Sequence, residues 1–214
     1  YNINFHKFKT VELPGEATNV EELPDGHDVK EYARHRGMLG LYPLFHVDTT
    51  LYRKRVTVPF LFNNEIVGWS GRHINPPNKS TPKYLQQIQP GYVFNIDRFT
   101  GGDRQIVVVC EGLIDAILLD GISVMGNSVT PEQAHLIDKL GMRVVLCPDR
   151  DRPGKQLIEQ AMELGWDVSF PPWSHDCKDA GDAVGKYGRL LTLSSIMEHA
   201  TDNRIKIQVK TKML

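Results

Sequence analysis

IVVVCEGLID at residues 106–115 and VVLCPDRDRPG at residues 144–154 are the two stretches that decide the fold of this chain. Each is an apolar run of strand length that ends in carboxylates: Glu111 in the first, Asp149 and Asp151 in the second. Acidic side chains gathered at one edge of a sheet repel one another unless a cation lies between them. Because Mg²⁺ and Mn²⁺ prefer oxygen ligands, the pattern predicts a divalent metal site.

The sequence around these stretches alternates between strand and helix patterns. Residues 113–120 are compatible with a helix, residues 122–125 with a buried strand, and residues 130–133 with a capping box that has proline at the first helical position. Helix and strand patterns recur at 154–164 and 167–170. The alternation predicts right-handed crossovers and a parallel sheet covered on both faces. Ligands bind at the carboxyl ends of such strands, where the acidic residues fall.

The first half of the chain has a different pattern. Residues 1–30 look like an irregular arm, and residues 29–35 are compatible with a short helix. Residues 55–62 and 65–70, joined by Asn63-Asn64, predict a β-hairpin. Pro59 in its first arm predicts a sheet edge or a bulge.

These patterns predict an α/β chain, α+β overall, in three parts. A smaller mixed α+β subdomain is expected over residues 1–102, the parallel-sheet domain over 103–190, and a C-terminal extension of helix or strand over 191–214. In the extension, residues 204–210 alternate between polar and apolar side chains, which favours a half-buried strand or an arm awaiting a partner.

The charge of the chain is balanced, with 25 basic and 26 acidic residues, which argues against indiscriminate coating of nucleic acid. Residues 53–104 nevertheless carry eight basic and three acidic side chains. A basic segment next to an acidic cluster fits phosphate-bearing ligands near a metal. A solvated charged face explains the same count equally well.

Several kinds of protein are disfavoured. The longest apolar runs are far shorter than the ~20 residues of a membrane span and no leader pattern opens the chain, so we expect a cytoplasmic protein without a membrane partner. Three cysteines, two of them within apolar runs, predict buried thiols rather than disulfides, and no CxxC pair is present for structural zinc. The GxxxxGK[ST] phosphate loop of a helicase motor is absent from the sequence. Tyr1 in place of methionine indicates a piece of a longer polypeptide.

Each candidate site residue also has a structural interpretation. Asp149 or Asp151 could cap the following helix, although capping explains only one of them. Asp115 lies one helical turn after Glu111 and could equally be an ordinary helical aspartate. Lys178 and Asp179 could place charges beside the cluster or form a surface ion pair. Three further cations could bind phosphates or be scattered surface charges: Arg72, Lys83 and Arg98.

The two acidic stretches resemble the EGxxD and DxDxxG motifs of the TOPRIM fold, at residues 111–115 and 149–154. TOPRIM domains occur in primases, topoisomerases, recombination mediators and nucleases, so the fold alone does not define the activity. The first half resembles, in order, the RNA-polymerase subdomain of bacterial and phage replicative primases, at residues 33–38, 55–60, 68–72 and 81–85. Residues 178–184 resemble the Lys-Asp motif that follows TOPRIM in phage enzymes.

The resemblance, over residues 30–190, implies the RNA-polymerase core of a DNA primase that lacks zinc-binding and helicase domains. It implies RNA primer synthesis on single-stranded DNA from ribonucleoside triphosphates, beside a replicative helicase, in a bacterium or a phage-infected host. Two Mg²⁺ or Mn²⁺ ions would be held by Glu111, Asp149 and Asp151, with Asp179 also catalytic and Asp115 supporting these ligands. Nucleotide or template would contact Arg72, Lys83, Arg98 and Lys178. The alternatives are a TOPRIM nuclease or topoisomerase-like fragment and a non-catalytic replisome scaffold.

Overall fold

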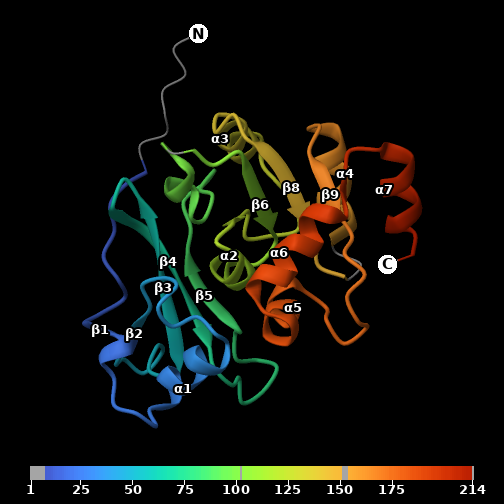
Figure 1. The fold of residues 1–214 in the computed structure, drawn as a ribbon. Helices are drawn as coiled ribbons and strands as arrows, with labels where there is room; N and C mark the ends of the chain where they lie inside the picture. The colour runs from blue at the N-terminus through green and yellow to red at the C-terminus, as the bar shows by residue number, and fades with distance from the viewer. Residues whose placement is uncertain (1–7, 102, 151–153, 214) are drawn as a thin grey trace. The chain divides into compact units, whose positions relative to one another are not determined.

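The computed structural model describes residues 8–101, 103–150 and 154–213. Contacts divide the chain into two units. The first unit contains the residues up to His35 and residues 42–92, and the second contains residues 36–41 and the chain from Val93 onward (Figure 1). The domain boundary expected between residues 102 and 103 stays a prediction.

The first unit is built on a five-stranded antiparallel sheet in the order β1-β2-β3-β4-β5. Its strands are β1 (Ala17–Asn19), β2 (Phe45–Val47), β3 (Arg55–Phe62), β4 (Glu65–His73) and β5 (Tyr84–Gln87). Two helical segments precede β2: the 3-10 helix η1 (Val20–Glu22) and α1 (Asp28–His35). The predicted short helix is therefore confirmed. The irregular arm expected over residues 1–30 is wrong for residues 17–22, because β1 pairs with β2 and residues 20–22 form η1, whose first residue, Val20, is fully buried.

The hairpin of β3 and β4 is confirmed at its predicted turn. Asn63 and Asn64 both have positive φ, 51° and 63°, as a two-residue hairpin turn requires and as asparagine tolerates. β3 lies between β2 and β4, but β2 pairs with it only at Thr57, so the ladder partner of Pro59 is Trp69 of β4. This ladder shifts register one residue later, between Phe60 and Leu61, which agrees with the bulge alternative.

The second unit contains the predicted parallel sheet, in the order β10-β9-β8-β6-β7. Its strands are β6 (Ile106–Cys110), β7 (Ile122–Ser123), β8 (Arg143–Cys147), β9 (Asp167–Ser169) and β10 (Ala200–Thr201). The pairs β6/β7, β6/β8 and β8/β9 are parallel, and β10 joins β9 antiparallel. The prediction from strand and helix alternation is thus confirmed.

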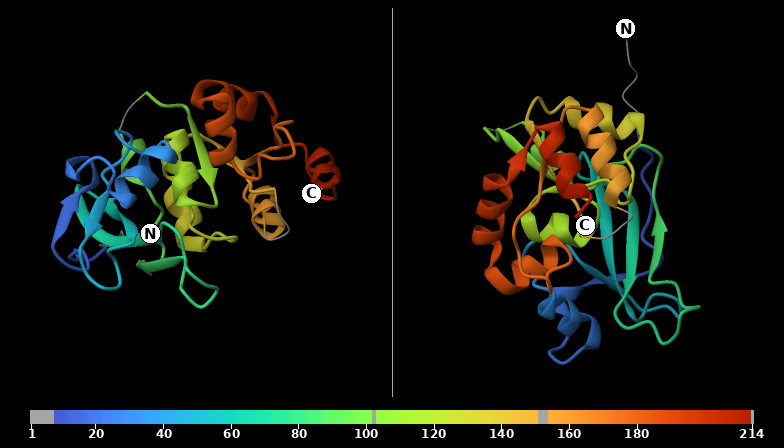
Figure 2. Two further views of the ribbon diagram at one scale, coloured as in Figure 1. Left: turned by 90° about the horizontal axis from the view of Figure 1, so that it is seen from below. Right: turned by 90° about the vertical axis from the view of Figure 1, so that its right-hand side faces the viewer.

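Helices cover both faces of this sheet (Figures 1 and 2). They are η2 (Ile96–Phe99), α2 (Leu113–Leu119), α3 (Pro131–Asp138), α4 (Gly154–Glu163), α5 (Ala180–Tyr187), α6 (Arg189–Glu198) and α7 (Arg204–Thr211). The crossover through α2 runs outward to β7, whereas those through α3 and α4 run in the opposite direction along the sheet. Right-handed connections therefore put α2 on one face, where it packs with α5 and α6, and α3 and α4 on the other.

Local signals explain where several of these elements begin. Thr130 caps α3 through the predicted capping box, with the Thr130 side chain accepting from the backbone of Gln133 and Pro131 at the first helical turn. The strand or arm expected over residues 204–210 is wrong, because these residues form α7. Asn203 caps α7 by accepting from the Lys206 amide, and of the three alternating apolar residues only Ile207 is buried.

The core of the second unit is apolar and closed. Val109 and Leu146 are fully buried in the central strands, and Ile158 of α4 is fully buried as well. The three cysteines are buried free thiols, as expected. In the described part of the chain, no helix combines the length and hydrophobicity that a membrane crossing requires.

Candidate active site

The candidate site begins where β6 and β8 end side by side. Cys110 and Cys147, the last residues of the two strands, are register partners in the parallel ladder. Glu111 follows β6 directly, and Asp149 follows β8 after Pro148. The backbone N–H of Asp149 donates to Glu111 Oε1 at 3.1 Å. The structure therefore brings together two of the three predicted metal ligands, and the third, Asp151, lies outside the described residues.

Asp115 joins this pair from the first turn of α2. Its side chain is buried, and its Oδ1 accepts a hydrogen bond of 2.7 Å from the Gly181 amide at the start of α5. Burial and the nearby carboxylates of Asp179 and Asp149 raise the pKa of Asp115 to about 7. The first turn of α2 and the start of α5 are thus joined through the buried carboxylate of Asp115.

Two glycines make this approach sterically feasible. A Cβ at Gly112 would lie 2.6 Å from Asp115 Oδ2, and a Cβ at Gly181 would lie 2.9 Å from Asp115 Oδ1. Both distances are below any ordinary contact, so a larger residue at either position would displace the Asp115 carboxylate. Glycine is therefore needed beside the acid in the EGxxD stretch and again at the start of α5.

The segment that contains Lys178 and Asp179 is held against the loop after β8. The amide of Arg150 donates to the Lys178 carbonyl at 2.8 Å. Asp179 caps α5 by accepting from the Asp182 amide at 2.7 Å, and Asp182 in turn accepts from the Lys178 amide at 3.1 Å. Asp179 thus has a capping role, and it also adds negative charge near Asp115.

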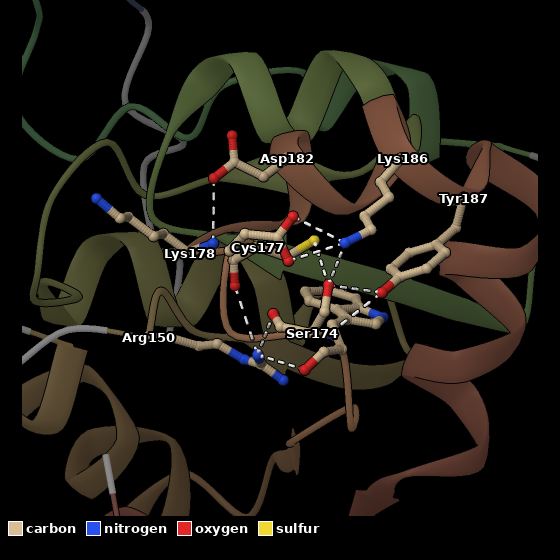
Figure 3. A network of polar contacts seen from close by, with 9 residues as sticks. Arg150, Ser174, Cys177, Lys178, Asp182, Lys186 and Tyr187 are labelled. Atoms are coloured by element: carbon tan, nitrogen blue, oxygen red, sulfur yellow. Dashed lines mark hydrogen bonds and ion pairs between the residues drawn. The ribbon is translucent and has the colours of Figure 1, made fainter.

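Arg150 organises the loop that follows β9, a role that sequence reasoning missed. Its guanidinium donates to the carbonyls of Pro171, Trp173, Ser174 and Cys177 (Figure 3). A second group of contacts closes the same loop, where Lys186 of α5 reaches Asp176 and Ser174. Arg150 lies between two acidic residues in the sequence, and no local pattern there indicates its distant carbonyl partners.

The oxygen-rich composition of the site fits a hard divalent cation. Among residues 8–101, 103–150 and 154–213, no three histidine, cysteine or acidic side chains are grouped closely enough to hold a metal. The pair Glu111 and Asp149 would therefore need a further ligand, and Asp151 is the expected one. Burial raises the pKa of the Cys147 thiol, and the neighbouring carboxylates of Asp115 and Asp149 raise it further. Negative charge therefore accumulates beside Cys147.

The predicted phosphate-binding cations lie in different places. Lys178 is at the site described above. Arg72 and Lys83 belong to the first unit, where Arg72 donates to the hydroxyls of Tyr32 and Tyr84. The Lys83 ammonium lies 5.7 Å from the centre of the Tyr84 ring.

Arg98 is not brought to the carboxylate pair. Its Nε lies 3.4 Å from Asp120 Oδ1, just beyond the C-terminal end of α2, whereas Glu111 precedes the N-terminal end of the same helix. A helix of seven residues separates the two positions by about 10 Å.

Comparisons with known proteins place this site in a known domain. Residues 108–184 match the family model described as Toprim-like. The chain is 30% identical to the DNA primase of Campylobacter jejuni over 113 residues, which are 47% of this chain and 19% of that primase. It is 31% identical to the DNA primase of Listeria monocytogenes over 130 residues, 53% of this chain and 20% of that primase. The matched region is about a fifth of the length of these relatives.

Solved structures share the fold of nearly the whole chain. The DnaG catalytic core matches with a TM-score of 0.68 and 18% identity, covering 86% of this chain and 76% of that one. The primase fragment of the bacteriophage T7 primase-helicase protein matches with a TM-score of 0.52 and 20% identity, covering 78% and 70%. The expected TOPRIM parallel-sheet domain, preceded by a mixed α+β unit, is thereby confirmed as a fold.

Proposed function

We propose, from the premise that this is a TOPRIM-containing chain of the bacterial and phage primase type, that it synthesises short RNA primers on single-stranded DNA. The observation that supports this most directly is the hydrogen bond from the Asp149 amide to Glu111 Oε1. It fixes two carboxylates from separate strands at the carboxyl edge of the sheet, in a chain with the fold of a primase catalytic core.

We assign the binding of Mg²⁺ or Mn²⁺, two ions during the reaction, to Glu111, Asp149 and Asp151, with Asp179 close by. The metal would lower the pKa of the attacking 3′-hydroxyl and neutralise the leaving pyrophosphate. The remaining task of the protein is to position charge. Glu111 holds the loop after β8 through the Asp149 amide, and this contact supports the proposal that the two carboxylates share a ligand.

Asp115 acts as a positioning residue in this proposal. By accepting from the Gly181 amide, it fixes the start of α5 and therefore the neighbouring Asp179. Lys178 is exposed beside these acids and is suited to neutralise charge that develops on phosphate oxygens. Arg72 and Lys83, and Arg98 at the far end of α2, remain proposed contacts for nucleotide or template.

The proposed substrates are a single-stranded DNA template and ribonucleoside triphosphates, and the proposed partner is a replicative helicase. One related solved structure, from the primase DnaG of Mycobacterium tuberculosis, contains a double-stranded DNA oligomer with a 6-nucleotide overhang. The T7 primase fragment comes from a primase-helicase protein. These facts support the proposed partners of this chain through a shared fold.

Primer synthesis by the chain itself tests the proposal. The chain is incubated with single-stranded DNA, labelled ribonucleotides and Mg²⁺ or Mn²⁺, and short labelled oligoribonucleotides are resolved by electrophoresis. Asp149→Asn keeps the side-chain shape but removes the charge, so we expect synthesis to fall by at least about a hundredfold. The matched control is Asp202→Asn, which removes an exposed aspartate outside the site.

Two results would contradict the proposal. One is synthesis by Asp149→Asn at the rate of Asp202→Asn. The other is nicking of supercoiled plasmid by the wild-type chain without any labelled oligoribonucleotide, which would assign the same carboxylates to a TOPRIM nuclease.

A further inference from the structure

A cavity of about 500 Å³ lies beside the candidate active site, within the second unit. Three segments form it: the loop after β8, the chain from Ser169 to Lys178, and helix α7 with Met213. Pro148 and Lys178 of its lining are the sequence neighbours of Asp149 and Asp179. The cavity is therefore next to the carboxylates and shares Lys178 with the candidate active site, but Glu111, Asp149 and Asp179 are not in its lining.

The lining of the cavity is basic. Arg150, Lys178 and Lys210 all contribute to it, and no aspartate or glutamate in the described ranges does. The guanidinium of Arg150 is already engaged by backbone carbonyls (Figure 3). Among the described residues, the ammonium groups of Lys178 and Lys210 have no carboxylate partner. Positive potential is therefore available to an anionic ligand.

The lining also offers flat apolar surface. Phe170 and Trp173 line the cavity, and the Lys210 ammonium lies 5.7 Å from the centre of the Phe170 ring. Trp173 is 8% exposed, and its indole Nε1 is buried without a hydrogen-bond partner in the part of the chain that the structure describes. That atom has almost no accessible surface, so it lies behind the lining, and Trp173 offers a ligand only a small exposed apolar surface.

A structural interpretation accounts for part of this arrangement. Arg150 stacks 5.5 Å from the centre of the Trp173 ring, and its carbonyl contacts hold the loop after β9. That role explains Arg150 without any ligand. It does not explain why α7 places Lys210 near the ring of Phe170 in the same lining.

We infer that this cavity binds a nucleotide unit, with its phosphate at Lys178 and Lys210 and its planar ring against Phe170 and Trp173. Cations and aromatic faces together recognise a phosphate ester that carries a base. A free nucleotide and a nucleotide within a single strand present the same chemistry, and the titrations below distinguish them. The inference deepens the proposed function, on which its biological relevance rests, and it gives α7 a role in ligand binding.

Binding without metal separates this cavity from the carboxylate site. Calorimetric titrations are made in EDTA with ATP, with tripolyphosphate, which lacks a ring, and with a single-stranded oligodeoxythymidylate. We expect ATP or the oligonucleotide to bind, and tripolyphosphate to bind at least about tenfold more weakly than ATP, because it cannot stack.

The variant Lys210→Glu tests the assignment to α7. We expect it to weaken nucleotide binding at least about tenfold, and Lys210→Gln to weaken it less, because the first reverses the charge and the second removes it. Lys206→Glu is the matched control, since it makes the same change on the exposed side of the same helix and Lys206 does not line the cavity. Circular dichroism verifies that α7 is intact in all three variants.

The outcomes distinguish this inference from the proposed function. ATP binding identifies a free nucleotide as the ligand, and binding of the oligonucleotide alone identifies the strand; either supports the cavity. Metal-free nucleotide binding that Lys210→Glu abolishes supports it even if primer synthesis is never detected. Absence of binding by every ligand in EDTA, equal binding by Lys206→Glu and Lys210→Glu, or, in a chain that binds ATP, equal affinity for tripolyphosphate and ATP would overturn it, even in a chain that makes primers.

Discussion

The two ends of helix α2 handle negative charge in opposite ways. At the first turn, Asp115 is buried among other carboxylates, which raise its pKa to about 7 together with burial. Just past the last turn, Asp120 lies within 3.5 Å of three arginine side chains, Arg98, Arg104 and Arg189. One end concentrates like charges, and the other balances an aspartate that the helix dipole disfavours.

The difference indicates which acids are structural and which belong to a ligand site. The arginines come from η2, from the chain before β6 and from the start of α6, so Asp120 ties three segments to α2. The acids at the other end repel one another and make the unliganded fold less stable. Acids with perturbed pKa values are common at functional sites, which supports the proposed cation site.

The largest effect that the comparison predicts is for Glu111→Gln. The amide oxygen of glutamine can still accept from the Asp149 amide, so the loop after β8 should keep its place while the site loses one charge. We expect primer synthesis to fall by about a thousandfold, or about 4 kcal/mol of transition-state stabilisation. Electrophoresis of labelled oligoribonucleotides measures this loss.

The control for Glu111→Gln is Glu163→Gln in the last turn of α4, an exposed residue away from the site. A Glu111→Gln chain that retains full synthesis would remove Glu111 from the metal site. It would also reduce the first end of α2 to a structural cluster like the second.

The second prediction concerns pH. A carboxyl whose folded pKa is raised binds its proton more tightly in the folded state, so stability falls as pH rises from its unfolded pKa, near 4, to its folded pKa, about 7. Asparagine at position 115 stays neutral and can still accept from the Gly181 amide. Without metal, we expect Asp115→Asn to match the wild type near pH 4 and to exceed its stability by on the order of 3 kcal/mol above pH 7.

Urea unfolding at a series of pH values measures this difference, and the same assay on Asp120→Asn provides the comparison from the other end of the helix. A constant difference between Asp115→Asn and wild type at all pH values would show that the Asp115 carboxyl does not carry the predicted charge penalty.

The third prediction is that Mn²⁺ stabilises the wild-type chain. A ligand that binds only the folded state, at a hundredfold excess over its Kd, adds about 2.7 kcal/mol to the free energy of unfolding. We expect thermal unfolding to show this gain in the wild type and in Asp202→Asn, and to show little of it in Glu111→Gln. An equal gain in all three chains would place the bound metal elsewhere.

Sequence patterns predict the acidic cluster at the first turn of α2, which depends on residues next to strand ends. They give no sign of the cluster past the last turn, which depends on residues distant in the sequence. Glu111 and Asp149 follow apolar strands directly, and parallel strands end at the same edge, so local patterns were sufficient to bring them together. The cluster around Asp120 joins arginines from three separated segments, and no periodicity connects them. The sequence therefore gives no sign that Arg98 pairs with Asp120, and the binding of nucleotide or template by Arg98 stays a prediction.

The strand or arm expected over residues 204–210 of the C-terminal extension is wrong for a related reason. Residues 204–210 alternate between polar and apolar side chains as a half-buried strand does, yet Ile205 is 74% exposed and Val209 is 54% exposed in α7. The burial of Ile207 and the cap at Asn203 decide the helix, and burial depends on the packing of α7 beside α4. Tertiary contacts therefore overrode a local period of two.

The smallest expected effect belongs to Asp120→Asn. Asp120 has a positive φ of 54°, a conformation that asparagine adopts readily, so the substitution removes charge without straining the backbone. The three arginine side chains are 41–47% exposed and can be solvated once the carboxylate is lost, which limits the cost to about 1 kcal/mol. Urea unfolding should show this loss at low salt and less of it at high salt, because the pairs are screened.

Primer synthesis and Mn²⁺ stabilisation should remain at the wild-type level, since Asp120 lies at the other end of α2 from the carboxylate pair. A loss of synthesis as large as that of Glu111→Gln would mean that both ends of α2 serve the reaction, and that the arginines are held by Asp120 for a ligand rather than for the fold.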